Sequence, residues 1–275
     1  MKTRIISGAV AIVLLAGVLY FHDTLIFNTC ISLIAALMVY ELFKALKLGK
    51  EFVLESASLA LVIVLPILAD FLNIRDNLSI YFIIAFAYAV IYALSLLVGH
   101  KSVDMGDGSL AAFYTVIIAS AMTSLVLIEG CGDGLGVWHL VLTFLGAWFA
   151  DTGAYFAGTF FGKHKLCPEI SPKKTVEGLI GGIVSNALVF MLVGFMIFKF
   201  TDSADPNYLL LALMGVVCAV LGLIGDLLAS LVKRRQGIKD YGNIMPGHGG
   251  ALDRFDSVMF VAPFMAFCLM CLNVL

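Results

Sequence analysis

Nine stretches of about 20 mostly apolar residues follow one another along this chain. They cover residues 5–21, 25–46, 52–73, 79–99, 109–128, 137–161, 177–199, 207–232 and 255–275. A transmembrane helix needs about 20 such residues to cross the hydrocarbon core of a bilayer. The alternating apolar and polar pattern of a transmembrane β-barrel is absent from the sequence. The pattern therefore predicts an all-α, polytopic helical membrane protein with about nine transmembrane helices.

The scarcity of charged residues excludes an ordinary soluble domain. Asp, Glu, Lys and Arg make up 13% of the 275 residues, whereas soluble domains carry roughly 25%. Hydrophobic residues make up 61%, which is more than the interior of a soluble domain of this size can bury. The net charge of −2 gives no indication of nucleic-acid binding.

The first apolar stretch is expected to stay in the protein as a membrane span. Lys2 and Arg4 precede it, as basic residues precede the apolar core of a signal peptide. The stretch ends in Tyr-Phe-His-Asp at residues 20–23, and this end lacks the small residues of a cleavage site.

The basic residues predict the orientation in the membrane. If the N-terminus is cytoplasmic, fifteen of the seventeen Lys and Arg residues fall in cytoplasmic segments, and only Arg75 and Lys199 fall outside. Basic residues accumulate in the cytoplasmic loops of membrane proteins. We therefore expect a cytoplasmic N-terminus and a C-terminus outside. Since no long soluble extension is present, we expect a bacterial cytoplasmic (inner) membrane.

Charge is distributed unevenly between two parts of one integral membrane unit. The N-terminal part, residues 1–136, contains about five spans and little polar chemistry. Within it, Glu41 is expected to form an interfacial pair with Lys44 at the end of a span, and Glu55 and Asp70 are also expected at the interface. The C-terminal part, residues 137–275, contains two charged loops at 163–177 and 233–256. We expect these loops to be catalytic.

An aspartate within an apolar stretch adjoins each charged loop. Asp151 precedes the first loop and Asp226 precedes the second. A carboxylate in a span costs roughly 2.5–3.5 kcal/mol on insertion scales, so function is the default interpretation. A hydrogen bond between helices is the structural alternative.

The segment Ser-Pro-Lys-Lys-Thr at residues 171–175 directly precedes an apolar stretch. Lysines and hydroxyl groups beside the free backbone N–H groups of a helix N-terminus are typical of an anion site. Anchoring by positive charge alone would explain the lysines but not the serine, proline and threonine. Gly178 and Gly182 have the spacing of a close helix contact.

The second charged loop has a more specific pattern. Asp226, Ser230 and Lys233 are spaced to lie on one helical face, which suits a metal and phosphate site. Glycines at 247, 249 and 250 allow backbone N–H groups to close on a phosphate. Asp253 and Asp256 follow, and hard oxygen ligands favour Mg²⁺ over zinc. Two alternatives stay open: His248 is either catalytic or a structural turn residue, and Asp256 is either a ligand or a helix cap.

Around this second charged loop the sequence resembles the CDP-diacylglycerol synthase family, also called phosphatidate cytidylyltransferases. The resemblance is specific over residues 147–260. The residues that match the family signature are Ser230, Lys233, Arg234, Lys239, Asp240, Pro246, His248, Gly249, Gly250, Asp253, Arg254 and Asp256. Asp-Thr-Gly-Ala-Tyr from 151, Phe-Gly-Lys-His-Lys from 161 and the segment 171–175 also look like the family. Thr159, Tyr241 and Ala251 depart from its pattern.

The resemblance implies transfer of CMP from CTP to phosphatidic acid, with CDP-diacylglycerol and pyrophosphate as products. It implies Mg²⁺, sometimes assisted by a monovalent cation such as K⁺, an active site that faces the cytoplasm, and a possible homodimer. The expected catalytic residues are Asp226, Asp253, Lys233 and His248, and the expected metal ligands are Asp226, Asp253 and Asp256. The expected substrate-binding residues are Ser171, Lys173, Lys174, Thr175, Ser230, Arg234, Lys239, Asp240, Gly247, Gly249, Gly250 and Arg254. Asp151 is expected to orient lysines or to bind a second cation.

Three other functions remain as alternatives. A CTP-dependent polyprenol or phytol kinase and an ether-lipid cytidylyltransferase share the same cationic, Mg²⁺-dependent chemistry. A transporter is a remote alternative, because it would place paired ionisable groups near the middle of the membrane, whereas Asp151 and Asp226 lie toward the ends of their stretches.

Overall fold

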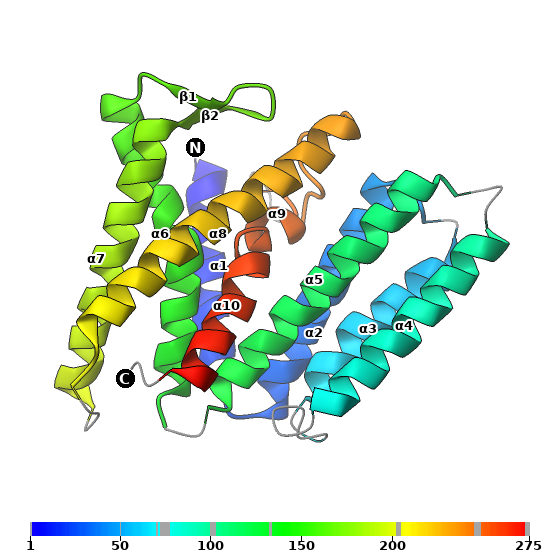
Figure 1. Cartoon of the computed structure of the whole chain (residues 1–275), viewed down its shortest axis with the longest axis horizontal. Coiled ribbons are helices and arrows are strands. Elements are labelled where there is room, and N and C mark those ends of the chain that lie inside the picture. Colours follow the sequence, from blue (N-terminus) through cyan, green and yellow to red (C-terminus); the bar gives the residue numbers. More distant parts are fainter. Residues whose placement is uncertain are drawn as a thin grey trace. The chain divides into compact units, whose positions relative to one another are not determined.

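A computed structural model describes residues 2–49, 51–69, 71, 78–99, 103–131, 134–201, 205–244 and 249–272. Helices dominate this part of the chain (Figure 1). They are α1 (Lys2–Tyr20), α2 (Leu25–Ala45), α3 (Phe52–Leu68), α4 (Leu78–Val98), α5 (Met105–Glu129), α6 (Gly136–Phe161), α7 (Val176–Phe200), α8 (Tyr208–Arg235), α9 (Leu252–Phe255) and α10 (Val258–Cys271). Each apolar stretch of the sequence coincides largely with one of these helices, and the ninth coincides with α10. The prediction of helices in these stretches is confirmed.

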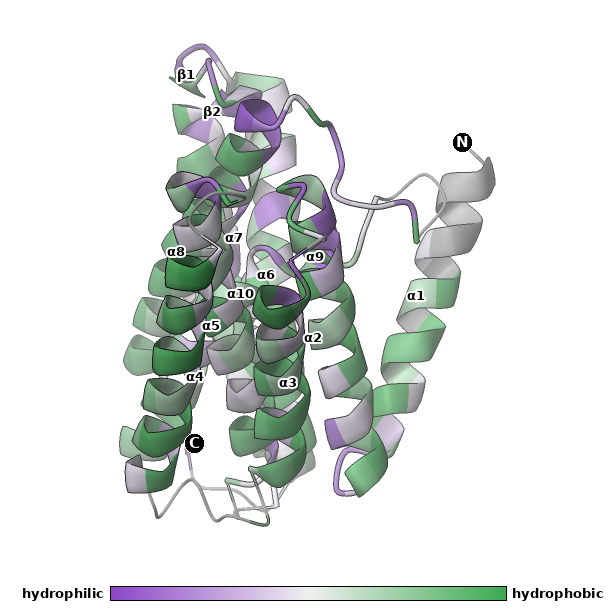
Figure 2. Ribbon diagram, turned by 90° about the vertical axis from the view of Figure 1, so that its right-hand side faces the viewer, coloured by the Kyte–Doolittle hydropathy of each residue, from purple (hydrophilic) through white to green (hydrophobic). Residues whose placement is uncertain are grey.

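Six of the described helices are long and apolar enough to cross a membrane, namely α2, α4, α5, α6, α7 and α8. The apolar helices α3 and α10 are shorter, with 17 and 14 residues. The outer surface of α4 is typical of contact with lipid, because Phe82 and Phe86 are 68% and 72% exposed. In Figure 2 apolar residues run along the helices, and hydrophilic residues gather in the β-hairpin that follows α6.

That hairpin is the one departure from the all-α expectation within the described residues. Strand β1 (Lys165–Cys167) pairs with strand β2 (Ser171–Thr175) in an antiparallel sheet. Both strands lie in the first charged loop. Backbone hydrogen bonds therefore order a segment that the sequence predicts only as a polar connection between two spans.

The chain folds into two compact units. The first unit comprises Met1–Gly130 and Arg235–Phe255, and the second comprises Cys131–Arg234 and Asp256–Leu275. The second charged loop thus belongs mostly to the first unit, although the division expected at residue 136 assigns it to the C-terminal part.

In the first unit, α2, α3, α4 and α5 run side by side (Figure 1). Hydrogen bonds connect these helices in their apolar interior. The Ser32 hydroxyl of α2 donates to the carbonyl oxygen of Ile63 in α3 at 3.0 Å. The Tyr92 hydroxyl of α4 donates to the carbonyl oxygen of Gly108 in α5 at 2.9 Å. Such bonds satisfy polar groups that would otherwise be buried without a partner.

In the second unit, α6 and α7 pack closely against each other. A Cβ atom added at Gly182 would lie 2.8 Å from the carbonyl oxygen of Ala150, and one at Gly178 would lie 2.9 Å from that of Ala154. Only glycine permits this approach, and the predicted glycine contact between helices is confirmed. The buried Asn186 of α7 donates to the carbonyl oxygens of Gly146 in α6 and Gly215 in α8, at 3.2 and 2.9 Å.

Candidate active site

The β-hairpin of the second unit presents the basic segment 171–175. Strand β2 carries Lys173 and Lys174 and ends at Thr175, whose extended backbone makes it the N-cap of α7. The Thr175 hydroxyl accepts a hydrogen bond from the N–H of Gly178 at 3.1 Å. The cap therefore fixes the point at which the strand with the two lysines turns into the helix.

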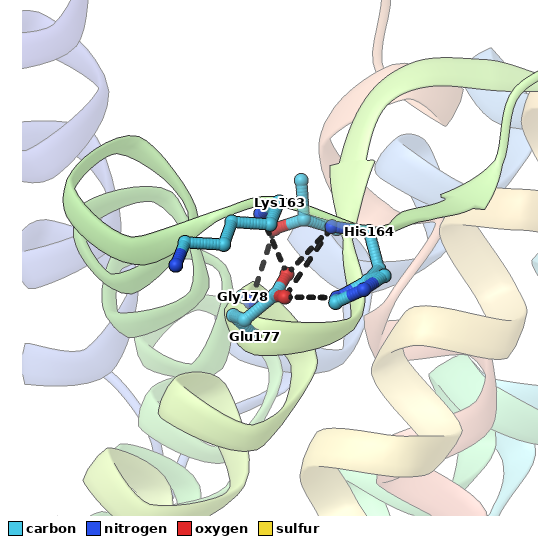
Figure 3. A network of polar contacts seen from close by, with 5 residues as sticks. Lys163, His164, Glu177 and Gly178 are labelled. Atoms are coloured by element: carbon cyan, nitrogen blue, oxygen red, sulfur yellow. Dashed lines mark hydrogen bonds and ion pairs between the residues drawn. The ribbon is translucent and has the colours of Figure 1, made fainter.

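The base of the hairpin is held by Glu177, in the first turn of α7. Its carboxylate accepts hydrogen bonds from the backbone N–H groups of Lys163 and His164, at 3.1 and 3.2 Å. The ring Nδ1 of His164 also lies 2.6 Å from the carboxylate (Figure 3). The sequence patterns described above did not predict a role for Glu177. The signal was present, because an acidic residue in the first turn of a helix is a common partner for nearby N–H groups.

Lys174 and Asp226 bring the hairpin and α8 together. The Nζ atom of Lys174 lies 2.5 Å from Oδ2 of Asp226, and the two side chains are 21% and 25% exposed. The Ser230 hydroxyl, one turn along α8, donates to Oδ1 of Asp226 at 3.4 Å. Asp226 and Ser230 therefore share a helical face, as their spacing predicts. Arg234 further along α8 donates from Nε to the carbonyl oxygen of Ile170 in the hairpin at 3.3 Å.

Asp256 adds a second carboxylate to this region. It lies between α9 and α10, is 8% exposed, and accepts a hydrogen bond from the N–H of Ser257 at 2.7 Å. The negative charges of Asp226 and Asp151 and the positive charge of Lys233 act electrostatically on Asp256. These charges act on Asp256 only because the side chains lie near it. The second unit thus gathers three of the predicted acidic residues with Lys233.

A cavity of about 410 Å³ opens in the second unit beside the hairpin. Lys165, Lys173 and Lys174 line it together with Asp151 and Thr159. The rest of the lining is mostly apolar residues of α6, α7 and α8, together with Leu166 and Thr175 of the hairpin. A cavity with three ammonium groups and an apolar wall suits a ligand that carries both phosphate and apolar groups.

The acidic residues of the second unit fit a magnesium ion. Among the described residues, no group of three His, Cys, Asp or Glu side chains is arranged to hold a metal. Mg²⁺ is usually held by one or two carboxylates together with substrate phosphates and water, rather than by a complete protein cage. Asp226, which pairs with Lys174 of the hairpin, and the nearby Asp256 supply two carboxylates, so the donor set is of the required kind.

Asp253 lies in the first unit and closes the glycine-rich turn. Its carboxylate Oδ2 accepts hydrogen bonds from the N–H groups of Tyr241 and Gly250, at 2.8 and 3.0 Å. Gly249 has a φ of +91°, and a Cβ there would lie 2.9 Å from Oδ2 of Asp253. The sequence predicts that the Gly250 backbone faces a phosphate. In the described structure its N–H donates to Asp253, and phosphate binding there stays a prediction.

The remaining predicted residues of this loop are placed only in part. Lys239, Asp240 and Arg254 are exposed on the first unit. Gly247 and His248 lie outside the described residues. Asp253 and Asp226 belong to different units, so a metal ion that both residues share stays a prediction.

Glu41 of α2 also contacts this loop, although it lies about 200 residues earlier in the chain. The sequence predicts an interfacial pair with Lys44, whereas the structure buries Glu41, which is only 2% exposed, against the loop. Its Oε2 accepts a hydrogen bond from the N–H of Leu252 at 2.9 Å. A charged residue within an apolar stretch was the signal that could have identified it.

Comparisons with known proteins agree along the whole chain. A model of the cytidylyltransferase family matches residues 2–272. The chain belongs to this family. It is 36% identical over 273 residues to a phosphatidate cytidylyltransferase of Bacillus subtilis (strain 168), which covers 98% of the chain and 97% of the relative. It is 32% identical over 269 residues to a phosphatidate cytidylyltransferase of Staphylococcus haemolyticus (strain JCSC1435), which covers 96% and 97%.

Within this cytidylyltransferase, the structure places two of the residues that depart from the family pattern, Tyr241 and Thr159. Tyr241 is 5% exposed, and its backbone N–H donates to Asp253. The Thr159 hydroxyl donates to the carbonyl oxygen of Tyr155 at 2.6 Å, within its own helix. Thr159 therefore adds no positive charge to the cavity that it lines, and the three lysines supply the cationic groups there.

Proposed function

We propose that this protein is a phosphatidate cytidylyltransferase that transfers CMP from CTP to phosphatidic acid. The products are CDP-diacylglycerol and pyrophosphate, and the reaction serves phospholipid biosynthesis. The observation that carries the proposal is the similarity to two phosphatidate cytidylyltransferases over nearly the full length of all three chains. The lysine-lined cavity beside Asp226 supports it, because both substrates are phosphate anions and one of them is a lipid.

The reaction is an in-line displacement at the α-phosphorus of CTP. A phosphate oxygen of phosphatidic acid forms the new bond to this phosphorus, and the bond between the α-phosphorus and the bridging β-oxygen breaks. Pyrophosphate leaves with the electron pair of that bond. The attacking oxygen is already anionic, so the protein contributes mainly positioning and neutralisation of charge.

The residues divide these tasks according to their charge. Lys173, Lys174 and Lys233 bind phosphate oxygens, and Lys174 exchanges Asp226 for a phosphate when substrate enters the cavity. Thr175, Ser171 and Ser230 orient these groups. On the exposed surface of the first unit, Lys239 and Arg254 are further contacts for phosphate.

Magnesium is part of the proposal. Asp226, Asp253 and Asp256 would hold the ion, and Asp151 would orient lysines or hold a monovalent cation such as K⁺. When bound, Mg²⁺ neutralises phosphate charge in the transition state. The exchange of Lys174 from Asp226 to a phosphate leaves the Asp226 carboxylate available at the same time.

The activity assay measures pyrophosphate from CTP and phosphatidic acid in the presence of Mg²⁺. Label in the α-phosphate of CTP should enter the lipid. If label from the γ-phosphate enters the lipid instead, the protein is a lipid kinase. An ether-lipid substrate offered in parallel distinguishes the second alternative. If the purified protein releases no pyrophosphate that depends on lipid, the proposal is wrong.

We further propose nine spans in a bacterial cytoplasmic membrane, with the N-terminus and the active site facing the cytoplasm and the C-terminus outside. The unequal distribution of basic residues supports this orientation. Cys131 and Cys167 provide a test, since the orientation places them on opposite sides. The test uses variants in which either Cys131 or Cys167 is the only cysteine left in the chain. An impermeant maleimide should label Cys131 in cells with a permeable outer layer, and Cys167 only after lysis. Labelling of Cys167 in intact cells contradicts the orientation.

A homodimer is the proposed assembly. Mass measurement of the full chain in lipid nanodiscs tests it, because one disc should then hold two copies at protein concentrations where random co-insertion is rare. A single copy per disc contradicts the dimer without affecting the proposed reaction.

A further inference from the structure

The loop that carries Asp253 is attached to α2 through a buried carboxylate. Glu41 is 2% exposed, and its Oε2 accepts the N–H of Leu252, the first residue of α9, at 2.9 Å. A hydrogen bond to a carboxylate is roughly twice as strong as one between neutral groups. The bond joins residues 211 positions apart in the chain. It therefore connects the N-terminal helices directly to the second charged loop.

Two glycines of this loop enclose the same carboxylate. A Cβ atom at Gly242 would lie 2.1 Å from an oxygen atom of Glu41, and one at Gly250 would lie 2.3 Å from an oxygen atom of the same residue. A side chain at either position would displace the carboxylate or the loop. The glycines thus serve a purpose other than phosphate binding in the described structure, since they make room for Glu41.

The same short segment sets the position of Asp253. Asp253 follows Leu252 in α9, is 7% exposed, and accepts N–H groups from Tyr241 and Gly250. Two carboxylates therefore hold the turn. Glu41 accepts the N–H of Leu252, and Asp253 accepts the N–H of Tyr241. The contact with Glu41 thus adds support from α2 to the bonds within the loop that orient Asp253.

We propose that Glu41 is a positioning residue for the reaction, which acts by fixing the turn 249–253 and thereby the carboxylate of Asp253. In this role Glu41 would act through the loop and would not itself bind substrate or metal. The proposal rests on the proposed function in one respect, namely that Asp253 is a catalytic carboxylate. The attachment of the loop can be measured without any assay of activity.

The decisive experiment combines hydrogen–deuterium exchange with steady-state kinetics on the full chain in nanodiscs. In Glu41→Ala, we expect peptides that contain Leu252 to exchange at least about tenfold faster, because a buried backbone hydrogen bond is lost. Peptides from α5 should be unchanged. We expect kcat to fall about 10- to 100-fold, the range seen when a partner that orients a ligand is removed, with KM for CTP within about twofold of the wild type.

Two further variants separate positioning from general stability. Glu41→Gln retains the oxygen that accepts the Leu252 N–H and the volume between the glycines, so we expect it to restore slow exchange and to keep kcat within about threefold of the wild type. Met38→Ala is the matched control, because Met38 is fully buried on the same helix and its side chain has no oxygen to accept the Leu252 N–H. It should lower Tm without faster exchange at Leu252.

Each outcome decides between the possibilities. Normal exchange at Leu252 in Glu41→Ala overturns the proposal, and so does a loss of kcat in Glu41→Gln as large as that in Glu41→Ala. Equal effects of Met38→Ala and Glu41→Ala on the loop also overturn it. If Glu41→Ala does not fold, Gly250→Ala provides the same test of the loop, since its methyl group would collide with Glu41. If the wild type lacks transferase activity, the proposed function fails while the exchange data still test the attachment.

Discussion

Lys174 on strand β2 and Asp226 on α8 form an ion pair, with 2.5 Å between Nζ and Oδ2. Both side chains are partly exposed and adjoin the cavity that Lys174 lines. A pair that is only partly removed from water contributes little to stability, because solvent screens the attraction and competes for both ions. In the proposed reaction, the two groups would neutralise each other until a phosphate binds the lysine.

Substitution of Asp226 should remove activity and leave the fold intact. For Asp226→Asn we expect kcat to fall by at least about 100-fold, since a preorganised charged group is typically worth that much in the transition state. Because the pair is partly exposed, Tm should change by no more than a few degrees. Pyrophosphate release and thermal unfolding measure the two effects. Asp205→Asn is the control, since Asp205 is exposed in the same unit. Full activity of Asp226→Asn excludes this carboxylate from the reaction.

Removal of divalent cations should abolish the reaction. With a chelator present, we expect pyrophosphate release to fall to background and to return when Mg²⁺ is added in excess. Asp226 and Asp256 offer oxygen ligands without a cluster of His or Cys, which is the donor type that Mg²⁺ prefers. Ca²⁺ should restore activity poorly, because it accepts a looser coordination geometry. Activity that persists after chelation and dialysis contradicts the prediction.

Loss of Glu177 should weaken substrate binding more than it weakens the fold. Its carboxylate holds the N–H groups of Lys163 and His164 at the base of the hairpin. In Glu177→Ala the hairpin loses this support, so Lys173 and Lys174 are less well ordered. We expect KM for CTP to rise about tenfold, corresponding to about 1.4 kcal/mol. Glu169→Gln changes an exposed acid of the same hairpin and should leave KM unchanged. An unchanged KM in Glu177→Ala would show that the hairpin is stable without the bond.

A larger side chain at Gly182 should separate α6 from α7. An added Cβ already lies 2.8 Å from the carbonyl oxygen of Ala150, and the additional atoms of leucine have no space between the helices. We expect Gly182→Leu to lower the free energy of unfolding by about 1–3 kcal/mol, as for other overpacked contacts, and to reduce activity because Gly182 lines the cavity. Val184→Leu is the control, since Val184 is 54% exposed on the same helix. Wild-type Tm in Gly182→Leu argues against close packing there.

The helices could be predicted from the sequence, whereas the small strands could not. Within a bilayer every backbone N–H and C=O must find a partner in the protein, so a long apolar stretch predicts a helix almost without reference to the rest of the chain. This constraint on backbone hydrogen bonding does not apply to the polar hairpin 165–175. Its strands have three and five residues, and Pro172 within one of them argues against a strand in a sequence read alone.

The candidate site was predicted in part. The spacing of Asp226 and Ser230 is a local property of one helix, so the sequence was sufficient to place them on one face. The pairing of Asp226 with Lys174 joins α8 to the hairpin, and the sequence predicts that both residues are functional without predicting that they touch. Glu41 shows the larger limit, because its interpretation as an interfacial residue depended on its neighbour Lys44 while its actual partner is Leu252.

The sequence by itself determined that the chain is helical and apolar, where its helices lie, and which short segments contain polar chemistry. These properties depend on composition and on the period of a single helix, which neighbouring residues encode. Only the tertiary structure decided that Glu41 holds the turn beside Asp253, that Glu177 holds the hairpin, and that Asp226 meets Lys174. Each of these contacts depends on which helix faces pack together, and that choice is made by the whole chain rather than by any local pattern.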